Sequence, residues 1–229
     1  MSVRGCFVSG SDTGAGKTVV GCAVVRALRA RGLDVGVLKP IETGVGEAGP
    51  LDAIALREAA GSDESIDEIC PQQFPLPAAP NVAAKHARGG VDLDAIDRAF
   101  TRCAAQHEFV LAEGAGGLLV PVAEGLSMAD LALRFDLPLI IAARAALGTI
   151  NHTLLTLEAA AARGLELLGV VISHVDGELS AADRANLDHL RKALGERMIG
   201  EIPPLAAGVD APLDAIDVDR VLRGATQFG

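Results

Sequence analysis

The stretch that decides the fold is VSGSDTGAGKTVV, which runs from Val8 to Val20. A short apolar run ends here in glycines and small polar residues, and a second apolar run with helical spacing follows. Gly10, Gly14 and Gly16 allow tight backbone turns and let peptide N–H groups come close to a ligand. The stretch therefore predicts a strand, a glycine-rich loop and a helix, in that order.

Two residues at the end of the loop indicate what it binds. Lys17 adds a fixed positive charge, the hydroxyl of Thr18 is the usual Mg²⁺ contact in such loops, and the following helix points its positive end at the same place. The spacing differs from the standard G-x-x-x-x-G-K-[ST] pattern, because Ser11 stands where the first glycine is expected and Gly10 lies one residue early. We predict a polyphosphate site; a glycine-rich turn with a chance Gly-Lys-Thr sequence is the alternative.

The composition fits one large α/β domain with an aliphatic core. The chain has 229 residues, of which 50% are hydrophobic but only 3% aromatic, so Ala, Val, Leu and Ile must fill the interior. Its formal net charge of −10 argues against a nucleic-acid surface or an anionic membrane surface, both of which need positive charge. A nucleotide remains compatible, because a single loop can supply the local positive field.

The cysteines and the apolar runs indicate the cytoplasm. Four cysteines lie far apart without a C-x-x-C pair, which is typical of buried reduced thiols rather than of disulfides or a zinc site. The first apolar run is a short strand rather than a signal peptide, and no apolar stretch is long enough to span a membrane. We therefore expect a cytoplasmic protein without membrane or nucleic-acid partners.

Short apolar runs, often β-branched, alternate with helical patterns along the chain. The predicted strands are Gly5–Ser9, Val35–Lys39, Phe109–Glu113, Pro138–Ala143, Leu167–Ser173 and Met198–Ile202. The predicted helices are Lys17–Arg31, Asp52–Ala60, Asp92–Gln106, Ser127–Phe135, Asn151–Arg163, Ser180–Leu194 and Ala215–Arg223. This alternation predicts an α/β fold with a doubly wound, mostly parallel sheet, similar to a P-loop NTPase, in a single domain over residues 1–229. Residues 44–50 and 71–80 are predicted to be mobile loops.

Ligands of a parallel sheet collect beyond the carboxyl ends of its strands, so the residues there are candidates for a site. Lys39 ends the second predicted strand and, with Thr43 close behind, faces the region of the loop; a solvated surface lysine is the alternative. Glu113 ends a buried strand, where a carboxylate is costly unless it is paired or binds a metal such as Mg²⁺; a solvated turn residue is the alternative. Asp52 opens a helix, as a site residue or as an N-cap.

The stretch ALGTINHTLLT, from Ala146 to Thr156, indicates a second anion site. Gly148 and Thr149 precede a predicted helix, so free backbone N–H groups gather there, and Asn151 and His152 add polar groups. An ordinary capped helix with His152 as a bystander is the alternative.

Taken together, these stretches resemble the dethiobiotin synthetases. The family pattern G-T-D-T-x-x-G-K-T stands here as GSDTGAGKT, with Ser11 for the usual Thr, so the early glycine is a feature of the family. Its patterns K-P-x-x-[ST]-G, E-G-A-G-G, L-G-x-I-N-H-x-L-L-T and G-E-I-P match KPIETG, Glu113–Gly117, LGTINHTLLT and Gly200–Pro203. The matches run in order from residue 7 to about residue 204.

The resemblance implies an ATP- and Mg²⁺-dependent cyclo-ligase of biotin biosynthesis that forms C–N bonds. In that reaction 7,8-diaminopelargonate takes up CO₂, supplied as bicarbonate, on one amine. ATP phosphorylates the carbamate to a carbamic–phosphoric anhydride, and the second amine closes the ring of dethiobiotin. The resemblance also implies a homodimer with shared active sites, because the segment that matches Gly148–His152 comes from the neighbouring subunit in this family.

The resemblance further implies roles for individual residues. Lys17 and Lys39 are the expected catalytic residues, and Thr18, Asp52 and Glu113 are the expected Mg²⁺ ligands. The residues expected to bind ATP are Asp12, Thr13, Gly14, Ala15, Gly16, Lys17, Thr18, Val19, Glu113, Gly116 and Ser173. The residues expected to bind the substrate are Thr13, Lys39, Thr43, Gly116, Gly117, Gly148, Thr149 and Asn151.

Ser173 departs from the family pattern, in which an Asn contacts the adenine. A serine has one hydroxyl in place of the paired donor and acceptor of an amide. We therefore expect a relaxed choice of nucleotide.

Two other classes share parts of this pattern. Cobyrinate-type amide synthetases carry a further glutaminase domain with a nucleophilic cysteine, for which we expect no room in a chain that ends at Gly229. Partition-type regulatory ATPases carry a signature lysine early in the loop, where Asp12 stands here. We therefore expect a ligase rather than a regulatory switch.

Overall fold

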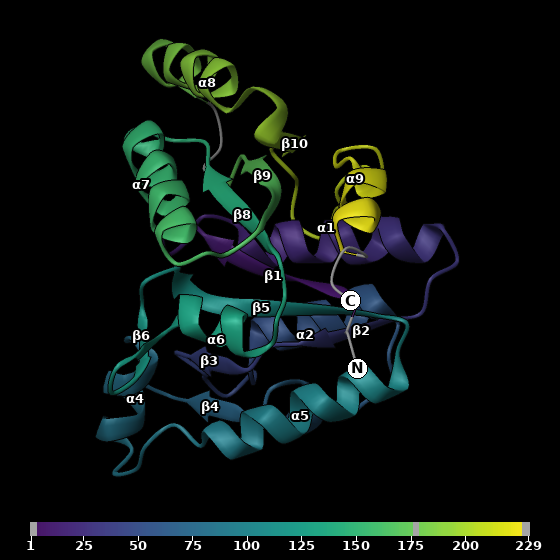
Figure 1. Ribbon diagram of the computed structural model, residues 1–229, viewed down its shortest axis with the longest axis vertical. Helices are drawn as coiled ribbons and strands as arrows, with labels where there is room; N and C mark the ends of the chain where they lie inside the picture. Colours follow the sequence, from purple (N-terminus) through teal and green to yellow (C-terminus); the bar gives the residue numbers. More distant parts are fainter. Residues whose placement is uncertain (1–3, 176–178, 226–229) are drawn as a thin grey trace.

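The computed structural model describes residues 4–175 and 179–225. Its central sheet consists of β1 (Gly5–Gly10), β2 (Val35–Leu38), β5 (Phe109–Gly117), β8 (Leu139–Arg144), β9 (Leu167–Ser173) and β10 (Met198–Ile202). All six strands are parallel, in the order β10-β9-β8-β1-β5-β2, so the chain adds strands first on one side of β1 and then on the other (Figure 1). The six predicted strands and the doubly wound parallel sheet are thus confirmed, and the change of direction lies at β1, where the phosphate loop begins. The predicted end of one strand at Glu113 is wrong, because β5 continues to Gly117 beside β1.

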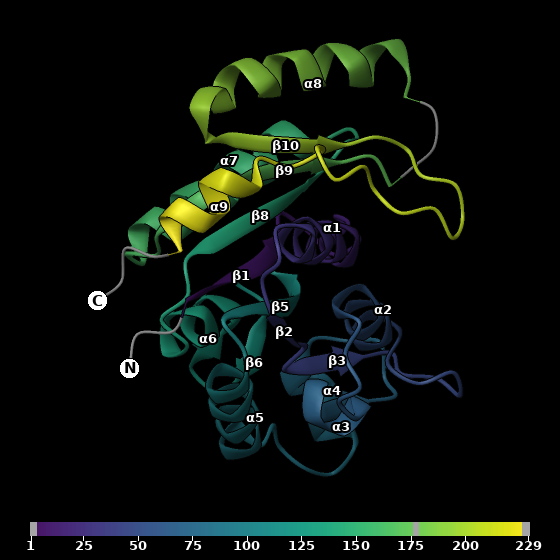
Figure 2. The same cartoon turned by 90° about the vertical axis from the view of Figure 1, so that its right-hand side faces the viewer.

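Helices cover both faces of this sheet (Figure 2). One face carries α1 (Lys17–Ala30), α2 (Leu51–Ala60) and α9 (Val218–Gly224). The other face carries α5 (Leu93–Gln106), α6 (Met128–Arg134), α7 (Thr149–Ala162) and α8 (Ala181–Leu194). The predicted helices are confirmed to within a few residues at their ends. Three of them begin one residue later than predicted because Asp92, Ser127 and Ser180 are N-caps, whose side chains accept a backbone N–H.

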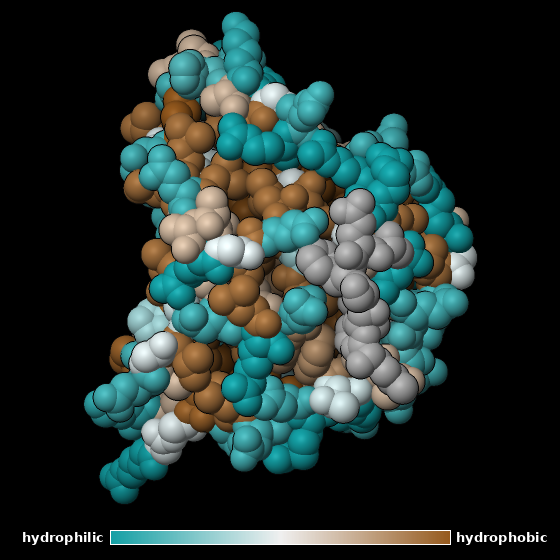
Figure 3. Space-filling model, viewed as in Figure 1, coloured by the Kyte–Doolittle hydropathy of each residue, from teal (hydrophilic) through white to brown (hydrophobic). Residues whose placement is uncertain are grey.

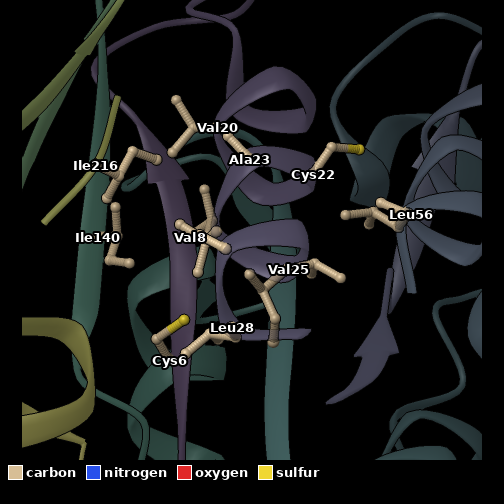
Figure 4. Packing of buried hydrophobic residues seen from close by; sticks show 14 of the residues in the cluster. Cys6, Val8, Val20, Cys22, Ala23, Val25, Leu28, Leu56, Ile140 and Ile216 are labelled. Atoms are coloured by element: carbon tan, nitrogen blue, oxygen red, sulfur yellow. The ribbon is translucent and has the colours of Figure 1, made fainter. Parts of the chain in front are cut away.

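The core is aliphatic, as the composition predicts. Figure 4 shows α1 packed on β1, with Val8, Val20, Val25 and Leu28 among the buried side chains and Leu56 of α2 on the far side of the helix. The four cysteines are buried and free, in agreement with the prediction of reduced thiols. None of the helices in the described parts of the chain is long and apolar enough to cross a membrane.

Several short elements were not predicted. They are the parallel pair β3 (Ile41–Thr43) and β4 (Gln72–Phe74), the antiparallel pair β6 (Pro121–Ala123) and β7 (Leu126–Ser127), the helices α3 (Ile66–Ile69) and α4 (Pro80–His86), and a short 3₁₀ helix (Gly195–Arg197). The prediction that residues 71–80 form a loop is therefore wrong in part, because β4 lies within them. A strand of three residues shows no periodicity, and its pairing with β3 is decided by a distant part of the chain.

Candidate active site at the carboxyl edge of the sheet

The phosphate loop lies between the end of β1 and the start of α1, as predicted. Gly14 and Gly16 have φ angles of 71° and 82°, which other residues rarely adopt. Gly16 is the N-cap of α1, and no side chain caps this helix. The first N–H groups of α1 are therefore available to an anion at the loop.

The side chain of Lys17 folds back over the loop. A Cβ placed on Gly10 would lie 3.3 Å from Nζ of Lys17 and 2.7 Å from the backbone oxygen of Asp12, so only glycine fits beneath this side chain. Lys17 is 8% exposed; burial lowers its pKa below 10.5, and the charge of Lys39 lowers it further. The loop thus holds a poorly solvated positive charge that an anion would stabilise.

Lys39 directly follows β2, and its ammonium joins three elements at the edge of the sheet. Nζ lies 2.8 Å from Oδ2 of Asp52 in α2 and 2.5 Å from Oε1 of Glu113 in β5, and it donates to the carbonyl oxygen of Gly114 at 3.2 Å. Lys39 and Glu113 are 1% and 0% exposed, so the alternatives of a solvated lysine and a solvated glutamate are wrong. Asp52 is not an N-cap, because Pro50 holds that position in α2.

The charges in this cluster shift the pKa of one another. Burial by itself lowers the pKa of Lys39, but the carboxylates of Glu113 and Asp52 raise it above 10.5, so the amine is protonated. Burial raises the pKa of Asp52, but the charge and hydrogen bond of Lys39 hold it below 3.8. Burial raises the pKa of Glu113 above 4.5, against the opposing effect of Lys39. Each charge here therefore depends on the others.

The same carboxylates offer oxygen ligands for a divalent cation. The hydroxyl of Thr18 donates to Oε1 of Glu113 at 2.9 Å and helps to lower the pKa of Asp52, so the three expected Mg²⁺ ligands lie together. Oε2 of Glu113 is buried without a hydrogen-bond partner, which is costly for a carboxylate unless a cation binds it. Hard oxygen donors suit Mg²⁺, which commonly uses one or two carboxylates together with phosphate oxygens and water. Within residues 4–175 and 179–225 no group of three or more His, Cys, Asp or Glu side chains is arranged for a metal.

A cavity of about 380 Å³ opens beside this cluster. The predicted site residues that line it are Thr13, Gly14, Gly16, Lys17, Thr18, Val19, Lys39, Thr43, Asp52 and Gly116. Three further lining residues were not predicted: Glu42, Ala115 and Val175. Glu42 occupies an unspecified position of the K-P-x-x-[ST]-G pattern, and its one signal was its place between Lys39 and Thr43. Ala115 and Val175 are apolar, so only their position at a strand end pointed to them.

A second hollow, of about 400 Å³, adjoins the first and shares Thr13 with it. The predicted residues Asp12 and Gly117 line this hollow, together with His152 of α7. Nδ1 of His152 lies 3.4 Å from Oδ2 of Asp12. His152 therefore joins α7 to the phosphate loop within one chain.

Within one chain, two residues of the predicted anion site, Gly148 and Asn151, lie in a cavity separate from that of the two lysines, although His152 of the same stretch reaches Asp12. Gly148 and Asn151 line a third cavity, of about 520 Å³, beside Leu147, which is 80% exposed. Thr149 is buried, and its hydroxyl lies 3.5 Å from that of Thr153 rather than in this cavity. Figure 3 shows apolar side chains gathered over the region of α7. Within residues 4–175 and 179–225, the lining of the cavity that holds Lys17 and Lys39 does not include Gly148, Thr149 or Asn151.

Ser173 and Ala15 lie beneath the loop. Ser173 is 1% exposed, and among the described residues its Oγ has no hydrogen-bond partner. A Cβ on Gly16 would lie 2.4 Å from that Oγ, so the serine packs directly under the turn. The side chain of Ala15 is buried in the core, which leaves only its backbone for a nucleotide. Beyond Ser173, the side chain that reaches the cavity is that of Val175.

This parallel sheet and the glycine-rich loop at an uncapped helix N-terminus define a P-loop nucleotide-binding protein. The structure is similar to the crystal structure of a ParA family ATPase from Chlorobium tepidum TLS, with a TM-score of 0.53 over 98% of this chain and 99% of that one. At 14% sequence identity this likeness shows the fold alone. A family model described as an AAA domain matches residues 4–211.

Comparison with curated proteins identifies the family to which this P-loop protein belongs. The chain is 47% identical over 193 residues to the ATP-dependent dethiobiotin synthetase BioD of Anaeromyxobacter dehalogenans (strain 2CP-C), which covers 82% of this chain and 86% of the relative. It is 38% identical over 218 residues to the dethiobiotin synthetase of Aromatoleum aromaticum, and the match covers 93% of this chain and 96% of the relative. It is 35% identical over 227 residues to that of Bacillus licheniformis, with 96% and 97% covered. The chain belongs to the dethiobiotin synthetase family.

Proposed function

We propose that this chain converts 7,8-diaminopelargonate, CO₂ and ATP to dethiobiotin, as an ATP-dependent ligase that forms C–N bonds. Membership of the family supports the proposal. The observation that carries it is the presence of two buried lysines, Lys17 and Lys39, at one cavity. The reaction must bring together a carbamate and a terminal phosphate, and fixed positive charge offsets the repulsion between these two anions.

The reaction has three stages in which bonds form. The neutral N7 amine adds to CO₂, forms an N–C bond and loses a proton to give a carbamate. A carbamate oxygen then takes the terminal phosphoryl group of ATP, and ADP leaves. The second amine attacks the activated carbonyl carbon and loses a proton, and phosphate is expelled as the cyclic urea closes.

The two lysines have different parts in this proposal. Lys17, whose pKa is lowered by burial, is proposed to contact both the terminal phosphate and the carbamate. Lys39 is proposed to stabilise the carbamate and the charge that develops on it, with the hydroxyl of Thr43 as a hydrogen-bond partner. The remaining residues proposed to bind ATP are Asp12, Thr13, Gly14, Ala15, Gly16, Val19, Gly116 and Ser173, and for Ser173 and Ala15 the support is indirect because their side chains lie beneath the loop.

Thr18, Asp52 and Glu113 are proposed to hold Mg²⁺. When bound, the ion would neutralise charge on the phosphate oxygens of ATP. The chain's own contribution is to keep two carboxylates and one hydroxyl close together at the floor of the loop, where the unpartnered Oε2 of Glu113 supports a cation.

We also propose a homodimer in which Gly148, Thr149 and Asn151 of one subunit bind the carboxylate end of the substrate held by the other. The substrate has a long apolar tail, so its carboxylate must lie well away from amines placed at the two lysines. The separate cavity at the start of α7 and the exposed Leu147 beside it support a contact with a second copy. Gly116 and Gly117, at the end of β5, are proposed to approach the substrate through their backbone.

The setting proposed for this enzyme is the cytoplasm, with neither nucleic acid nor membrane as a partner. The net charge of −10 supports this proposal. The one six-stranded sheet, whose strands run from Gly5 in β1 to Ile202 in β10, supports a single domain over residues 1–229.

Incubation with 7,8-diaminopelargonate, bicarbonate, Mg²⁺ and ATP, followed by mass spectrometry, tests the function. We expect dethiobiotin and ADP in equal amounts, with no product when any one of the four is left out. ATP turnover that does not depend on the diamine and yields no cyclic urea would contradict the proposal.

A further inference from the structure

Glu42 is a buried carboxylate beside the cavity that belongs neither to the phosphate loop nor to the proposed metal ligands. It is the middle residue of β3 and is 7% exposed. Both of its oxygens accept N–H groups from the first turn of α2: Oε1 accepts from Asp52 at 3.0 Å, and Oε2 accepts from Ala53 at 3.0 Å. Helices are usually capped by the side chain of their own N-cap, but Pro50 holds that position here and cannot accept. A strand therefore supplies the cap.

Asp52 is held from two sides by one segment of the chain. Glu42 accepts the backbone N–H of Asp52. Lys39, which precedes Glu42 in the same segment, donates to the carboxylate of Asp52 at 2.8 Å. These contacts tie the start of α2 to the chain that leaves β2. Without the backbone contact, the first turn of α2 is free to shift, and a shift of about 1 Å is enough to disturb a site that depends on placement.

Capping alone does not explain a carboxylate at this position. Glu42 lines the same cavity as Asp52, and Glu113 adds a further negative charge nearby. A buried carboxylate near two others is costly, and a hydroxyl at the N-cap closes a helix at a lower cost. The position of Glu42 is explained by its partner. Glu42 accepts the backbone N–H of Asp52, which is a proposed metal ligand.

We propose that Glu42 is a positioning residue for the metal site: its carboxylate fixes the first turn of α2 and so keeps the carboxylate of Asp52 close to Lys39 and Thr18. The inference rests on the proposed function, in which Asp52 is a Mg²⁺ ligand, and extends it to a residue outside the ligand set. Mutation of a residue that holds a metal ligand by a hydrogen bond typically lowers metal affinity by about 10- to 100-fold.

Binding of Mn²⁺ in the presence of a non-hydrolysable ATP analogue, followed by electron paramagnetic resonance, tests the inference. Glu42→Gln keeps the size of the side chain but turns an NH₂ group towards one of the two N–H groups. We expect the affinity for Mn²⁺ to fall by about tenfold, while the affinity for the analogue without metal stays unchanged. Amide hydrogen exchange at Asp52 and Ala53 should become faster in the same variant.

The matched control is Asp92→Ala. Asp92 caps α5 by accepting the N–H of Ala95 at 2.9 Å, on the other face of the sheet. We expect this variant to lose stability while its affinity for Mn²⁺ stays unchanged. The inference is overturned if Glu42→Gln binds Mn²⁺ as tightly as the unaltered chain, or if Asp92→Ala weakens Mn²⁺ binding to the same degree. Circular dichroism checks folding, and Glu42→Asp takes the place of Glu42→Gln if the latter does not fold.

The same experiment separates this inference from the proposed function. An unaltered chain that binds Mn²⁺ with the analogue but forms no dethiobiotin refutes the ligase and leaves the role of Glu42 standing. An unaltered chain that binds no Mn²⁺ with the analogue overturns the inference, because Asp52 then has no metal to be positioned for.

Discussion

Lys39 and Arg191 each lie between two carboxylates, and the two clusters differ in how deeply the charges are buried. At the proposed active site Lys39 contacts Asp52 and Glu113, and the side chains of Lys39 and Glu113 are 2% and 0% exposed. Between α8 and β10, Arg191 contacts Asp188 and Glu201, and the three side chains are 36%, 66% and 23% exposed. The arrangement of charge is the same, but the solvent around it is not.

Burial changes how strongly the members of an ion pair depend on each other for stability. Near the surface, water solvates each charge, so a pair contributes about 1 kcal/mol or less and either partner tolerates the loss of the other. In the interior, each charge has given up its hydration and depends on its partner, so the loss of one leaves a costly unpaired charge. The cluster at Arg191 joins a helix to a strand, whereas the cluster at Lys39 keeps charge where a charged ligand is proposed to bind.

The largest effect is expected when Lys39 is replaced. In Lys39→Met the buried Glu113 loses its ammonium partner, so we expect the free energy of unfolding to fall by about 3–5 kcal/mol. We also expect kcat to fall by roughly 10²-fold or more, since a charge that stabilises the transition state is lost. Urea denaturation and initial rates of dethiobiotin formation measure the two effects. The control is Arg191→Ala, for which we expect about 1 kcal/mol or less and an unchanged kcat; equal losses of stability would show that burial does not separate the clusters.

Lys17 differs from Lys39, because it is buried but has no ion-pair partner within residues 4–175 and 179–225. In Lys17→Met we expect kcat to fall by roughly 10²-fold or more. The melting temperature should stay the same or rise, because a buried charge without a direct ion-pair partner is removed. Steady-state kinetics and thermal melting test this. A loss of stability as large as that of Lys39→Met would mean that Lys17 is paired in the folded protein.

The pH dependence of stability compares the carboxylates of the two clusters. The folded pKa of Asp52 lies below its ordinary 3.8, so its contribution is fully present above pH 3.8 and is lost as pH falls through the folded value. The free energies of unfolding of the unaltered chain and Asp52→Asn should differ by about 1 kcal/mol or less near neutral pH, since this side chain is partly solvated, and the difference should shrink in acid. For Glu201→Gln we expect the same trend below pH 4.5: its difference from the unaltered chain in the free energy of unfolding should shrink as pH falls. The reason is that the hydrogen bond from Arg191 lowers the pKa of Glu201. Urea denaturation over a pH series tests the sign, and a difference that grows as pH falls would contradict it.

The smallest expected effect concerns the end of β9, where the described residues that lie at the cavity or beneath the loop are uncharged. Val175 lines the cavity there with an apolar side chain, and Ser173 is buried beneath Gly16. We expect kcat/KM for CTP and GTP to lie within about tenfold of that for ATP, because a single hydrogen bond contributes about 0.5–1.5 kcal/mol. Initial rates with the three nucleotides measure this, and a preference for ATP of several hundredfold would show a base contact that these residues do not explain.

Most of the fold and part of the site were predictable because their signals are local. The apolar runs of the six central strands and the alternation with helices can be recognised within short windows. The glycines, Lys17 and Thr18 of the loop are close neighbours in the chain, so their joint role follows from their spacing. Lys39 and Glu113 were found because both stand at predicted strand ends, and parallel strands end at the same edge of the sheet. Lys39 directly follows β2, whereas Glu113 lies within β5, which continues to Gly117.

Other features depend on residues that are far apart in the chain. The sequence by itself determined the sheet, the phosphate loop and the family to which the chain belongs, since each follows from the order of neighbouring residues. Only the tertiary structure decided that Lys39 binds Asp52 and Glu113, that Glu42 caps α2, and that Ser173 lies under the loop. The physical reason is that hydrogen bonds and ion pairs form between atoms that packing brings together, and packing depends on the whole chain.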